Sequence, residues 1–237
     1  MLTVPNDAGS LGDYLSLTPL LNSQKCVVQI YENEKSRELA KVYDEIADIE
    51  FVNHPVSPTG HTEEPVCLSQ RILNFYNVKN QSPIPKIKVK QEEIEWATEF
   101  LSKFKNPICF NRTVGKPNTG HPLAKYRQIP LELSKKIIEH CENRGFTVLN
   151  FCLSSNYEKI SNEIPILDLP LRNLIGCFNV IKKYVGSDTG DYHLMLAVGG
   201  IANVFVPPSI WHYDHSKHLY LEYAWQKEEK RVSYYSF

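Results

Sequence analysis

The sequence lacks an excess of charge of either sign, because its 26 lysines and arginines nearly balance its 27 aspartates and glutamates. A protein that binds nucleic acid through a strong positive field is therefore not expected. No apolar run approaches the roughly 20 residues of a transmembrane helix. The opening residues, MLTVPNDAGS, also lack the charged and apolar regions of a signal peptide. We expect a cytoplasmic protein without a transmembrane segment.

The sequence also lacks paired cysteines, since its six cysteines are scattered without a CxxC motif. Most of them stand among apolar residues, as core cysteines do, which favours a reducing compartment. With 237 residues, 42% of them hydrophobic, the chain can bury one large core or two small ones. Disulfides or metals are therefore not needed for folding.

Short apolar runs alternate with longer segments of helical period, which is the pattern of an α/β protein with helices over a parallel sheet. The predicted strands are 1–4, 27–31, 49–52, 107–111, 146–152 and 204–207. The predicted helices are 14–23, 37–48, 65–76, 92–104, 130–145 and 171–184. Residues 77–91, with two prolines and clustered lysines, predict a linker.

This alternation predicts two α/β units of unequal size, residues 1–104 and 105–237. Open sheets of this kind bind ligands at the carboxyl ends of their strands, so a cleft between the units is the expected site. The C-terminal tail has helical spacing followed by a charged face. We expect it either to return to the first unit or to contact another subunit.

The stretch SDTGDYHLMLAVGG, residues 187–200, predicts a strand end near Ser187, a tight turn, and a helix from around Asp191. The exposed amides of such a helix start suit a pyrophosphate, and a histidine in the first turn can donate to a phosphate oxygen. In the alternative interpretation an aspartate merely caps the helix and the glycine completes the turn. The candidate residues are Asp188, Thr189, Gly190, Asp191 and His193.

A long polar loop, residues 111–130, follows the first strand of the second unit. Loops of this length are usually functional or disordered. Because this loop leaves the carboxyl end of its strand, we expect it near the 187–191 turn, where Lys125 or Arg112 would neutralise a diphosphate. The alternative is a solvated surface loop. Its basic residues are Arg112, Lys116, Lys125 and Arg127.

Near the start, NDAGSLGDYLSLTPLL places Gly9, Gly12 and Asp13 between a short strand and a helix. A glycine-rich first turn suggests a dinucleotide fold, but the GSLGD spacing lacks the full GxGxxG pattern. Asp13 would face the cleft from the start of the first helix. It is alternatively only a helix cap.

The segment WHYDHSKH, residues 211–218, has three histidines and an aspartate, and its spacing invites a metal hypothesis. No cysteine or further acidic pattern joins the cluster, and prolines flank it. An aromatic, histidine-rich loop over a sugar site is an equally good interpretation. We therefore predict no metal site.

Taken together, three stretches resemble glycosyltransferase family 9, which includes the ADP-heptose:lipopolysaccharide heptosyltransferases. GSLGDYLSLTPLL is similar to the family's S-x-G-D-hydrophobic-x-x-x-x-P signature. AKYRQIP is similar to its K-x-x-x-W-P stretch, with Ile129 at the tryptophan position. VGSDTGDYHLMLAVGG resembles V-G-x-D-[ST]-G-x-x-H-L-A-x-A-x-G, with Met195 in place of an alanine.

The resemblance implies an α/β GT-B fold of two Rossmann-like domains, here with a shortened N-terminal domain. It implies an inverting glycosyltransferase of polysaccharide biosynthesis, independent of metal and cofactor. Such an enzyme moves a heptose or other hexose-like sugar from a nucleotide-diphosphate donor to a glycan, lipid-linked glycan or protein acceptor. Its place would be cytoplasmic, with a peripheral position at the inner membrane face as the alternative.

The resemblance also implies roles for particular residues, with Asp13 as the catalytic base. The nucleoside contact would be Asn156 or Glu158. The implied diphosphate-binding residues are Lys125, Asp188, Thr189, Gly190, Asp191 and His193, with Thr113 as a weaker neighbour. Two alternatives remain open: a non-catalytic GT-B-like protein that binds a nucleotide or glycan, and a sugar-nucleotide epimerase.

Overall fold

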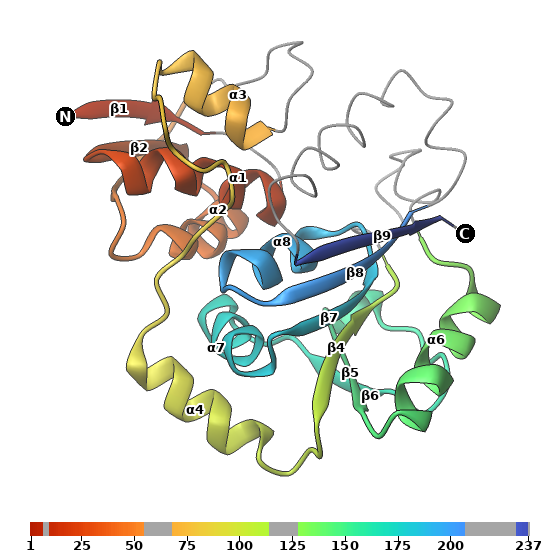
Figure 1. Cartoon of the computed structure of the whole chain (residues 1–237). Helices are drawn as coiled ribbons and strands as arrows, with labels where there is room; N and C mark the ends of the chain where they lie inside the picture. Colours follow the sequence, from red (N-terminus) through yellow and green to blue (C-terminus); the bar gives the residue numbers. More distant parts are fainter. Residues whose placement is uncertain (7–9, 55–67, 114–127, 207–230, 237) are drawn as a thin grey trace.

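The computed structural model describes residues 1–6, 10–54, 68–113, 128–206 and 231–236. Within them, two separate parallel sheets divide the chain into a smaller and a larger α/β unit (Figure 1). The described part of the smaller sheet has three strands and that of the larger sheet has six. This agrees with the prediction of an α/β protein with two units of unequal size.

The smaller sheet has the strand order β1-β2-β3, with β1 at Leu2–Pro5, β2 at Cys26–Tyr31 and β3 at Asp48–Val52. In the central strand β2, buried and partly exposed residues alternate, because successive side chains point to opposite faces. The helical elements of this unit are α1 (Leu11–Ser23), α2 (Glu34–Ala40), the 3-10 turn η1 (Lys41–Tyr43) and α3 (Leu68–Phe75).

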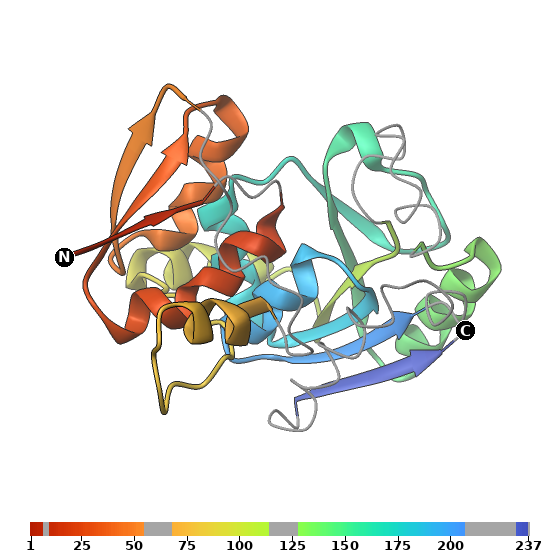
Figure 2. The ribbon, with the colours of Figure 1, turned by 90° about the horizontal axis from the view of Figure 1, so that it is seen from above.

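Helix α1 is apolar around most of its circumference, and its residues 14–21 are all buried. A helix of this kind must be covered on several sides. It packs against α3 of its own unit and against α8 (Gly190–Ala197) of the larger unit. Figure 2 shows α1 between the smaller sheet and α8. The helix thus joins the two units.

The larger sheet has the order β6-β5-β4-β7-β8-β9, and all its pairs are parallel. Its strands are β4 (Pro107–Asn111), β5 (Thr147–Cys152), β6 (Ile164–Leu167), β7 (Lys183–Ser187), β8 (Ile201–Val206) and β9 (Val232–Ser236). Its other helical elements are α4 (Gln91–Leu101), α6 (Leu131–Asn143), η2 (Ser154–Asn156) and α7 (Leu171–Ile181).

The core of this unit lies on both faces of the sheet. On β4, Ile108 and Phe110 belong to a cluster with residues of α6, whereas Cys109 belongs to the main core with α7 and α8. The side chains of the neighbouring strands are distributed over the two faces in the same way, and Val148 of β5 and Val185 of β7 belong to the cluster with α6. The near-continuous apolar runs of these strands therefore reflect burial on both faces, as in other parallel sheets.

Several elements differ from the predictions. The helix predicted to reach residue 184 ends at Ile181, because Lys182 adopts a left-handed conformation and β7 begins at once. The helix predicted to reach residue 48 ends at Ala40, where the 3-10 turn η1 follows it. Strand β6 was not predicted at all.

The described end of the C-terminal tail forms β9, which pairs with β8 at the edge of the larger sheet. No strand was predicted there. The expected return of the tail to the first unit therefore does not apply to residues 231–236. The segment with helical spacing lies outside the described residues.

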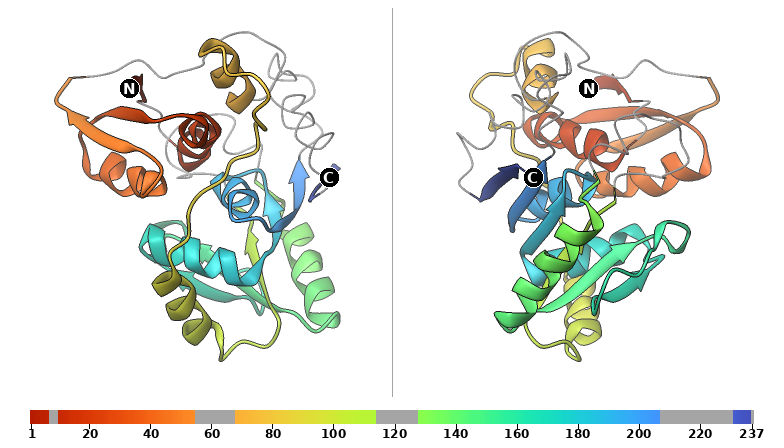
Figure 3. Two further views of the ribbon diagram at one scale, coloured as in Figure 1. Left: turned by 60° about the vertical axis from the view of Figure 1, so that its left-hand side comes forward. Right: turned by 90° about the vertical axis from the view of Figure 1, so that its right-hand side faces the viewer.

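Residues 76–90 lead from α3 to α4 without regular secondary structure, as the predicted linker requires. Figure 3 shows this segment running from the smaller unit down to α4, which lies beside α7. The packing is close, because a Cβ on Gly176 of α7 would lie 2.6 Å from the carbonyl oxygen of Glu93. The predicted boundary between residues 104 and 105 stays a prediction. We propose that the boundary between the two units lies before α4.

A buried ion pair holds the linker, α4 and the smaller unit at the start of α7. The guanidinium of Arg172 forms two bonds with the Glu93 carboxylate, at 2.5 and 2.6 Å. It also donates to the carbonyl oxygens of Lys41 and Lys88, at 3.2 and 3.1 Å. Next to it, the Leu171 amide donates to the Glu38 carboxylate at 2.8 Å. Four segments thus meet around one arginine.

Candidate functional site

The strand order of the larger sheet reverses between β4 and β7, since β5 and β6 lie to one side of this pair and β8 and β9 to the other. Ligands of open α/β sheets bind outside the carboxyl ends of the two strands at such a reversal. Here the ends are adjacent, with Asn111 of β4 in register with Gly186 of β7. The segments that leave them, Arg112–Thr113 and Ser187–Gly190, form the candidate site.

The turn after β7 has the predicted strand, turn and helix. Strand β7 ends at Ser187 and α8 begins at Gly190, one residue before the predicted start. Thr189 is the N-cap, and its hydroxyl accepts a hydrogen bond from the Asp191 amide at 3.3 Å. The alternative interpretation placed this role on Asp188 or Asp191, and the structure gives it to the threonine.

Tyr184 of β7 stabilises the turn through its hydroxyl group. No sequence motif indicated this residue. Its buried hydroxyl donates to the carbonyl oxygen of Ser187 at 2.7 Å and lies 3.2 Å from the Thr189 hydroxyl. Ser187, Asp188 and Thr189 are themselves all buried. The turn is therefore held by side chains, and the helix start is rigidly placed. A tyrosine within a buried strand was a signal for this, because its hydroxyl requires a partner.

The first turn of α1 lies directly against the first turn of α8. A Cβ on Gly190 would stand 2.9 Å from the Cβ of Leu11, and one on Gly12 would stand 3.1 Å from Cδ2 of His193. Both glycines thus allow two helices to approach each other. The missing side chain of Gly190 makes room for α1, and the predicted contact of Gly190 with a diphosphate stays a prediction.

Asp13 follows Gly12 in the first turn of α1, so it comes from the segment that contacts α8. The hydroxyl of Ser10, the N-cap, accepts from the Asp13 amide at 3.3 Å and donates to Asp13 Oδ2 at 2.6 Å. The cap is therefore Ser10, and the alternative interpretation of Asp13 as the cap is wrong. The fold therefore brings the first turn of α1, which carries Asp13, against the first turn of α8. Gly9 lies outside the described residues.

The Asp191 side chain is directed toward β4, where Oδ2 accepts a hydrogen bond from Asn111 Nδ2 at 2.6 Å. Burial of the carboxyl raises its pKa to about 6, and the hydrogen bond from Asn111 opposes this rise. The predicted contact of the Asp191 backbone amide with a diphosphate stays a prediction, but a contact of the Asp191 side chain is not favoured. Two negative groups would repel, and the carboxyl already has a partner.

This raised pKa predicts a pH-dependent stability. A carboxyl whose pKa is higher in the folded than in the unfolded chain stabilises the fold only while it is protonated. The contribution of Asp191 to the free energy of unfolding should thus fall as pH rises from about 4 to about 6. At neutral pH, Asp191→Asn should recover up to about 3 kcal/mol, since each pKa unit corresponds to roughly 1.4 kcal/mol.

Urea unfolding of the wild type and of Asp191→Asn across this pH range measures the effect. Other carboxyl groups titrate in both proteins, so the informative quantity is the difference between the two curves. Asp168 is one such group, and the hydrogen bond from Ser154 holds its pKa below its usual range. A difference that does not change between pH 4 and 7 would show that the Asp191 carboxyl has an ordinary pKa.

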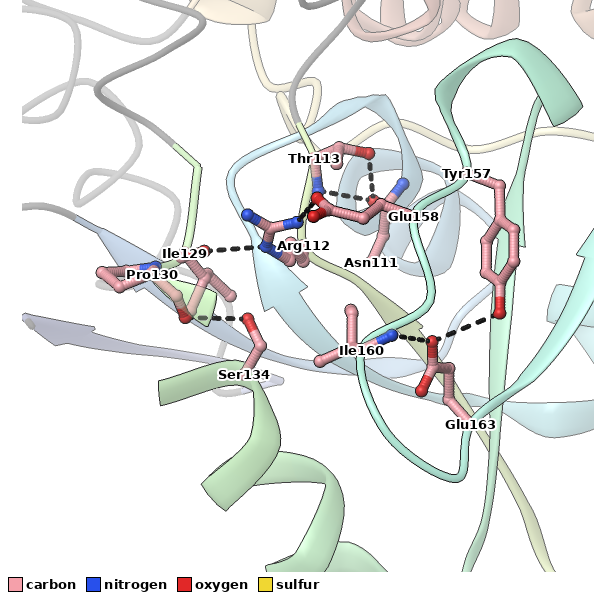
Figure 4. A network of polar contacts seen from close by, with 10 residues as sticks. All are labelled: Asn111, Arg112, Thr113, Ile129, Pro130, Ser134, Tyr157, Glu158, Ile160 and Glu163. Carbon is pink, nitrogen blue, oxygen red and sulfur yellow. Dashed lines mark hydrogen bonds and ion pairs between the residues drawn. The ribbon is translucent and has the colours of Figure 1, made fainter. Parts of the chain in front are cut away.

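Arg112 lies at the other side of the reversal and is mostly buried (Figure 4). Its Nε donates to the carbonyl oxygen of Ile129 at 3.1 Å, and a terminal nitrogen pairs with Glu158 Oε2 at 2.6 Å. In this structure the guanidinium is thus bound to protein groups, and its predicted role in neutralising a diphosphate stays a prediction. The Glu158 side chain is 62% exposed, so its carboxylate lies at the surface of the site.

Glu158 and Asn156 belong to the segment after β5, which further acidic side chains hold in place. Glu163 is buried and accepts from the amides of Ile160 and Ser161, at 2.8 and 2.7 Å. Asn156 closes the turn η2, and in the described contacts it has no part in the Arg112 network. Of the two predicted nucleoside contacts, Glu158 is the one linked to the strand reversal, through its ion pair with Arg112.

Several predicted residues lie outside the described part of the chain. These are Lys116, Lys125 and Arg127 of the long loop and the histidines of residues 211–218. Among the described residues, no group of histidine, cysteine, aspartate and glutamate side chains is arranged to hold a metal ion. None of the helices described is both long enough and apolar enough to span a membrane.

A cavity of about 300 Å³ lies away from these residues. Its lining comes from the ends of α4 and α7 and from the starts of β4 and β7, including Leu101, Asn106, Pro107 and Lys183. This is the amino edge of the sheet. Because ligands of this fold class bind at the carboxyl edge, the cavity does not belong to the candidate site.

No protein-family model and no curated protein matches the sequence. Solved structures nevertheless share its fold. A glycosyl transferase family 9 protein from Veillonella parvula is 13% identical with a TM-score of 0.69, over 99% of this chain and 86% of that one. ADP-heptose lipopolysaccharide heptosyltransferase II of E. coli is 11% identical with a TM-score of 0.69, over 99% and 90%.

A third similar structure is the iron-containing dodecameric glycosyltransferase TibC from enterotoxigenic E. coli. It is 12% identical with a TM-score of 0.59, and the match covers 86% of this chain and 57% of that one. Identities of this size show a likeness of fold. The predicted α/β, GT-B-like fold is thereby confirmed, and so is the resemblance to glycosyltransferase family 9 at the level of fold.

Proposed function

We propose that the protein is a glycosyltransferase that moves a sugar from a nucleotide-diphosphate donor to a hydroxyl group of a glycan, lipid-linked glycan or protein. One observation carries the proposal: the first turns of α1 and α8 touch at the reversal point of a GT-B-like sheet. An acidic side chain, Asp13, thus lies beside a helix start suited to an anion. The fold of the similar glycosyltransferases supports this interpretation.

In the proposed complex the donor diphosphate binds at the start of α8. The partial positive charge of the helix N-terminus favours a phosphate there, and Thr189 and His193 flank it. Lys125 adds the positive charge that a departing diphosphate requires. Thr113 is a weaker partner, because its amide and hydroxyl already donate to Asn111 Oδ1, at 2.9 and 3.1 Å.

Glu158 is the proposed contact of the ribose hydroxyls. Its carboxylate is exposed, yet the ion pair with the buried Arg112 holds it at the carboxyl edge of the sheet. A carboxylate with one oxygen bound to arginine keeps acceptor capacity for a hydroxyl group. Asn156 remains the alternative contact.

The proposed reaction is a single displacement with inversion. The Asp13 carboxylate takes the proton of the acceptor hydroxyl, whose oxygen bonds to the anomeric carbon as the bond to the diphosphate breaks. The negative charge that develops on the diphosphate is stabilised by the start of α8, Lys125 and His193. This scheme requires neither a metal nor a cofactor. The donor sugar is a heptose or another hexose-like sugar.

A thermal-shift series with ADP, GDP and UDP and their sugar conjugates tests the donor site. A ligand at 100 times its dissociation constant stabilises the folded state by about 2.7 kcal/mol, so at least one nucleoside diphosphate should raise the melting temperature clearly. The matching nucleoside monophosphate is the control and should have a much smaller effect, because the site is proposed to hold the diphosphate. Equal melting temperatures with all nucleotides contradict the proposal.

A further inference from the structure

Asn111, the last residue of β4, uses both ends of its side-chain amide. Its Nδ2 donates to Asp191 Oδ2 at 2.6 Å, and its Oδ1 accepts from the amide and the hydroxyl of Thr113. The two partners lie on opposite sides of the strand reversal. One amide group therefore fixes the first turn of α8 and the start of the long loop relative to each other, as Figure 4 shows for Thr113.

The hydrogen bond between Asn111 and Asp191 matters for the proposed donor site because Asp191 can carry a negative charge. A carboxylate in the first turn of α8 is close to the point where the proposed diphosphate binds, and negative charges at short range repel. The hydrogen bond from Asn111 keeps the carboxyl group against β4. Without this donor, the side chain would be able to turn toward the helix start.

The titratable side chains around Asp191 that are described below do not replace Asn111 as a partner of the carboxyl group. The charge of Asp191 contributes to raising the pKa of three titratable side chains. These are Cys109 on β4, Cys152 on β5 and Tyr184 on β7. All three are neutral at pH 7, so none offers the carboxylate a positive charge. Among these described neighbours, Asn111 supplies the hydrogen bond that favours the ionised form.

We propose that Asn111 is a positioning residue of the donor site, which holds the Asp191 carboxyl group against β4 and Thr113 beside it so that the start of α8 can accept a diphosphate. The inference rests on the proposed function and deepens it. Neither the motifs of the sequence nor the similarity of fold points to this residue.

The experiment compares the wild type with Asn111→Ala by calorimetric titration of ADP, GDP and UDP. For the nucleotide that binds, the affinity of the variant should fall about tenfold at neutral pH, the typical effect of losing one hydrogen bond to a charged group. The KM for the donor should rise by the same factor, with kcat within about threefold. The loss should shrink as the pH falls and Asp191 becomes protonated.

A second substitution separates positioning from general support of the fold. In Asn111→Ala with Asp191→Asn, the repelling charge is gone, so affinity should return to within about threefold of the wild type. Asn111→Asp is isosteric, replaces the donor by a second carboxylate, and should weaken binding at least as much as alanine. Asn203→Ala is the matched control: it is a partly buried asparagine of β8, in register with Val185 and Ser233.

The outcomes distinguish this inference from the proposed function. If the wild type binds a nucleoside diphosphate and either Asn111 variant binds it as well as Asn203→Ala does, the inference is wrong and the proposed function stands. The same holds if Asp191→Asn fails to restore affinity. If the wild type binds none of the three nucleotides, both are overturned.

Discussion

Asp13→Ala is expected to lower kcat for sugar transfer by about 10²- to 10⁴-fold, the usual contribution of a general base. The acceptor hydroxyl then has no group to take its proton as the new bond forms. Affinity for the nucleotide should stay within about threefold of the wild type, because the proposed donor contacts all come from the larger unit. A coupled assay of nucleoside diphosphate release, with calorimetry of the same samples, measures both quantities.

Asp13→Asn is the matched variant, since it keeps the shape of the side chain and can still accept the hydrogen bond from Ser10. It should lose turnover to a similar extent while its melting temperature stays near that of the wild type. Asp48→Ala, at the exposed start of β3, controls for a lost carboxylate elsewhere in the same unit. Full turnover in both Asp13 variants would exclude this residue as the base.

Assays of nucleoside diphosphate release, of nucleotide binding and of conversion of the free nucleotide sugar together separate the two alternative functions. A non-catalytic binding protein gives no nucleotide release with the wild type, although calorimetry detects the nucleotide. A sugar-nucleotide epimerase changes the free nucleotide sugar when no acceptor is present. The proposed glycosyltransferase releases the nucleoside diphosphate only in step with transfer to an acceptor.

The features predicted correctly from the sequence are those that local chemistry decides. The turn after Ser187 is an example, because the end of a buried strand, a short polar turn and a glycine follow one another within residues 183–190. The strands of the larger sheet around β4 were also predictable, since burial on both faces gives continuous apolar runs.

The two edge strands of the larger sheet escaped prediction for a physical reason. In β6, with the sequence IPIL, Ile166 alone is buried, and Pro165 is tolerated there because an edge strand leaves backbone groups unpaired. Such a segment is short, is interrupted by a proline and lacks a regular alternation of apolar and polar residues. Strand β9 is the opposite edge of the same sheet and directly follows a charged stretch.

The directions of the site side chains could not be predicted, because distant segments decide them. Gly190 makes room for Leu11, which is 179 positions away in the chain. Asp191 turns toward Asn111, 80 positions away. Arg112 is occupied by Glu158 and by the backbone beside Pro130. Sequence patterns predicted candidate site residues, and tertiary contacts determine where the side chains of those described are directed.

The largest expected loss of stability follows from Arg172→Ala. The Glu93 side chain is only 10% exposed, and without the arginine its carboxylate stays buried without its two strongest bonds. Breaking a buried pair in this way typically costs about 3 to 5 kcal/mol. The carbonyl groups of Lys41 and Lys88 lose a donor as well. Urea unfolding should therefore show a midpoint far below that of the wild type.

Two controls connect this loss to the buried charge. Glu132→Ala breaks an exposed pair with Lys135 on α6 and should leave the urea midpoint close to that of the wild type, because water already solvates both groups. Arg172→Met combined with Glu93→Leu removes both charges and should recover much of the loss. If Arg172→Ala unfolds within 1 kcal/mol of the wild type, the pair does not hold α7 to the linker and the smaller unit. The contact between α1 and α8 would then have to keep the two proposed halves of the site together by itself.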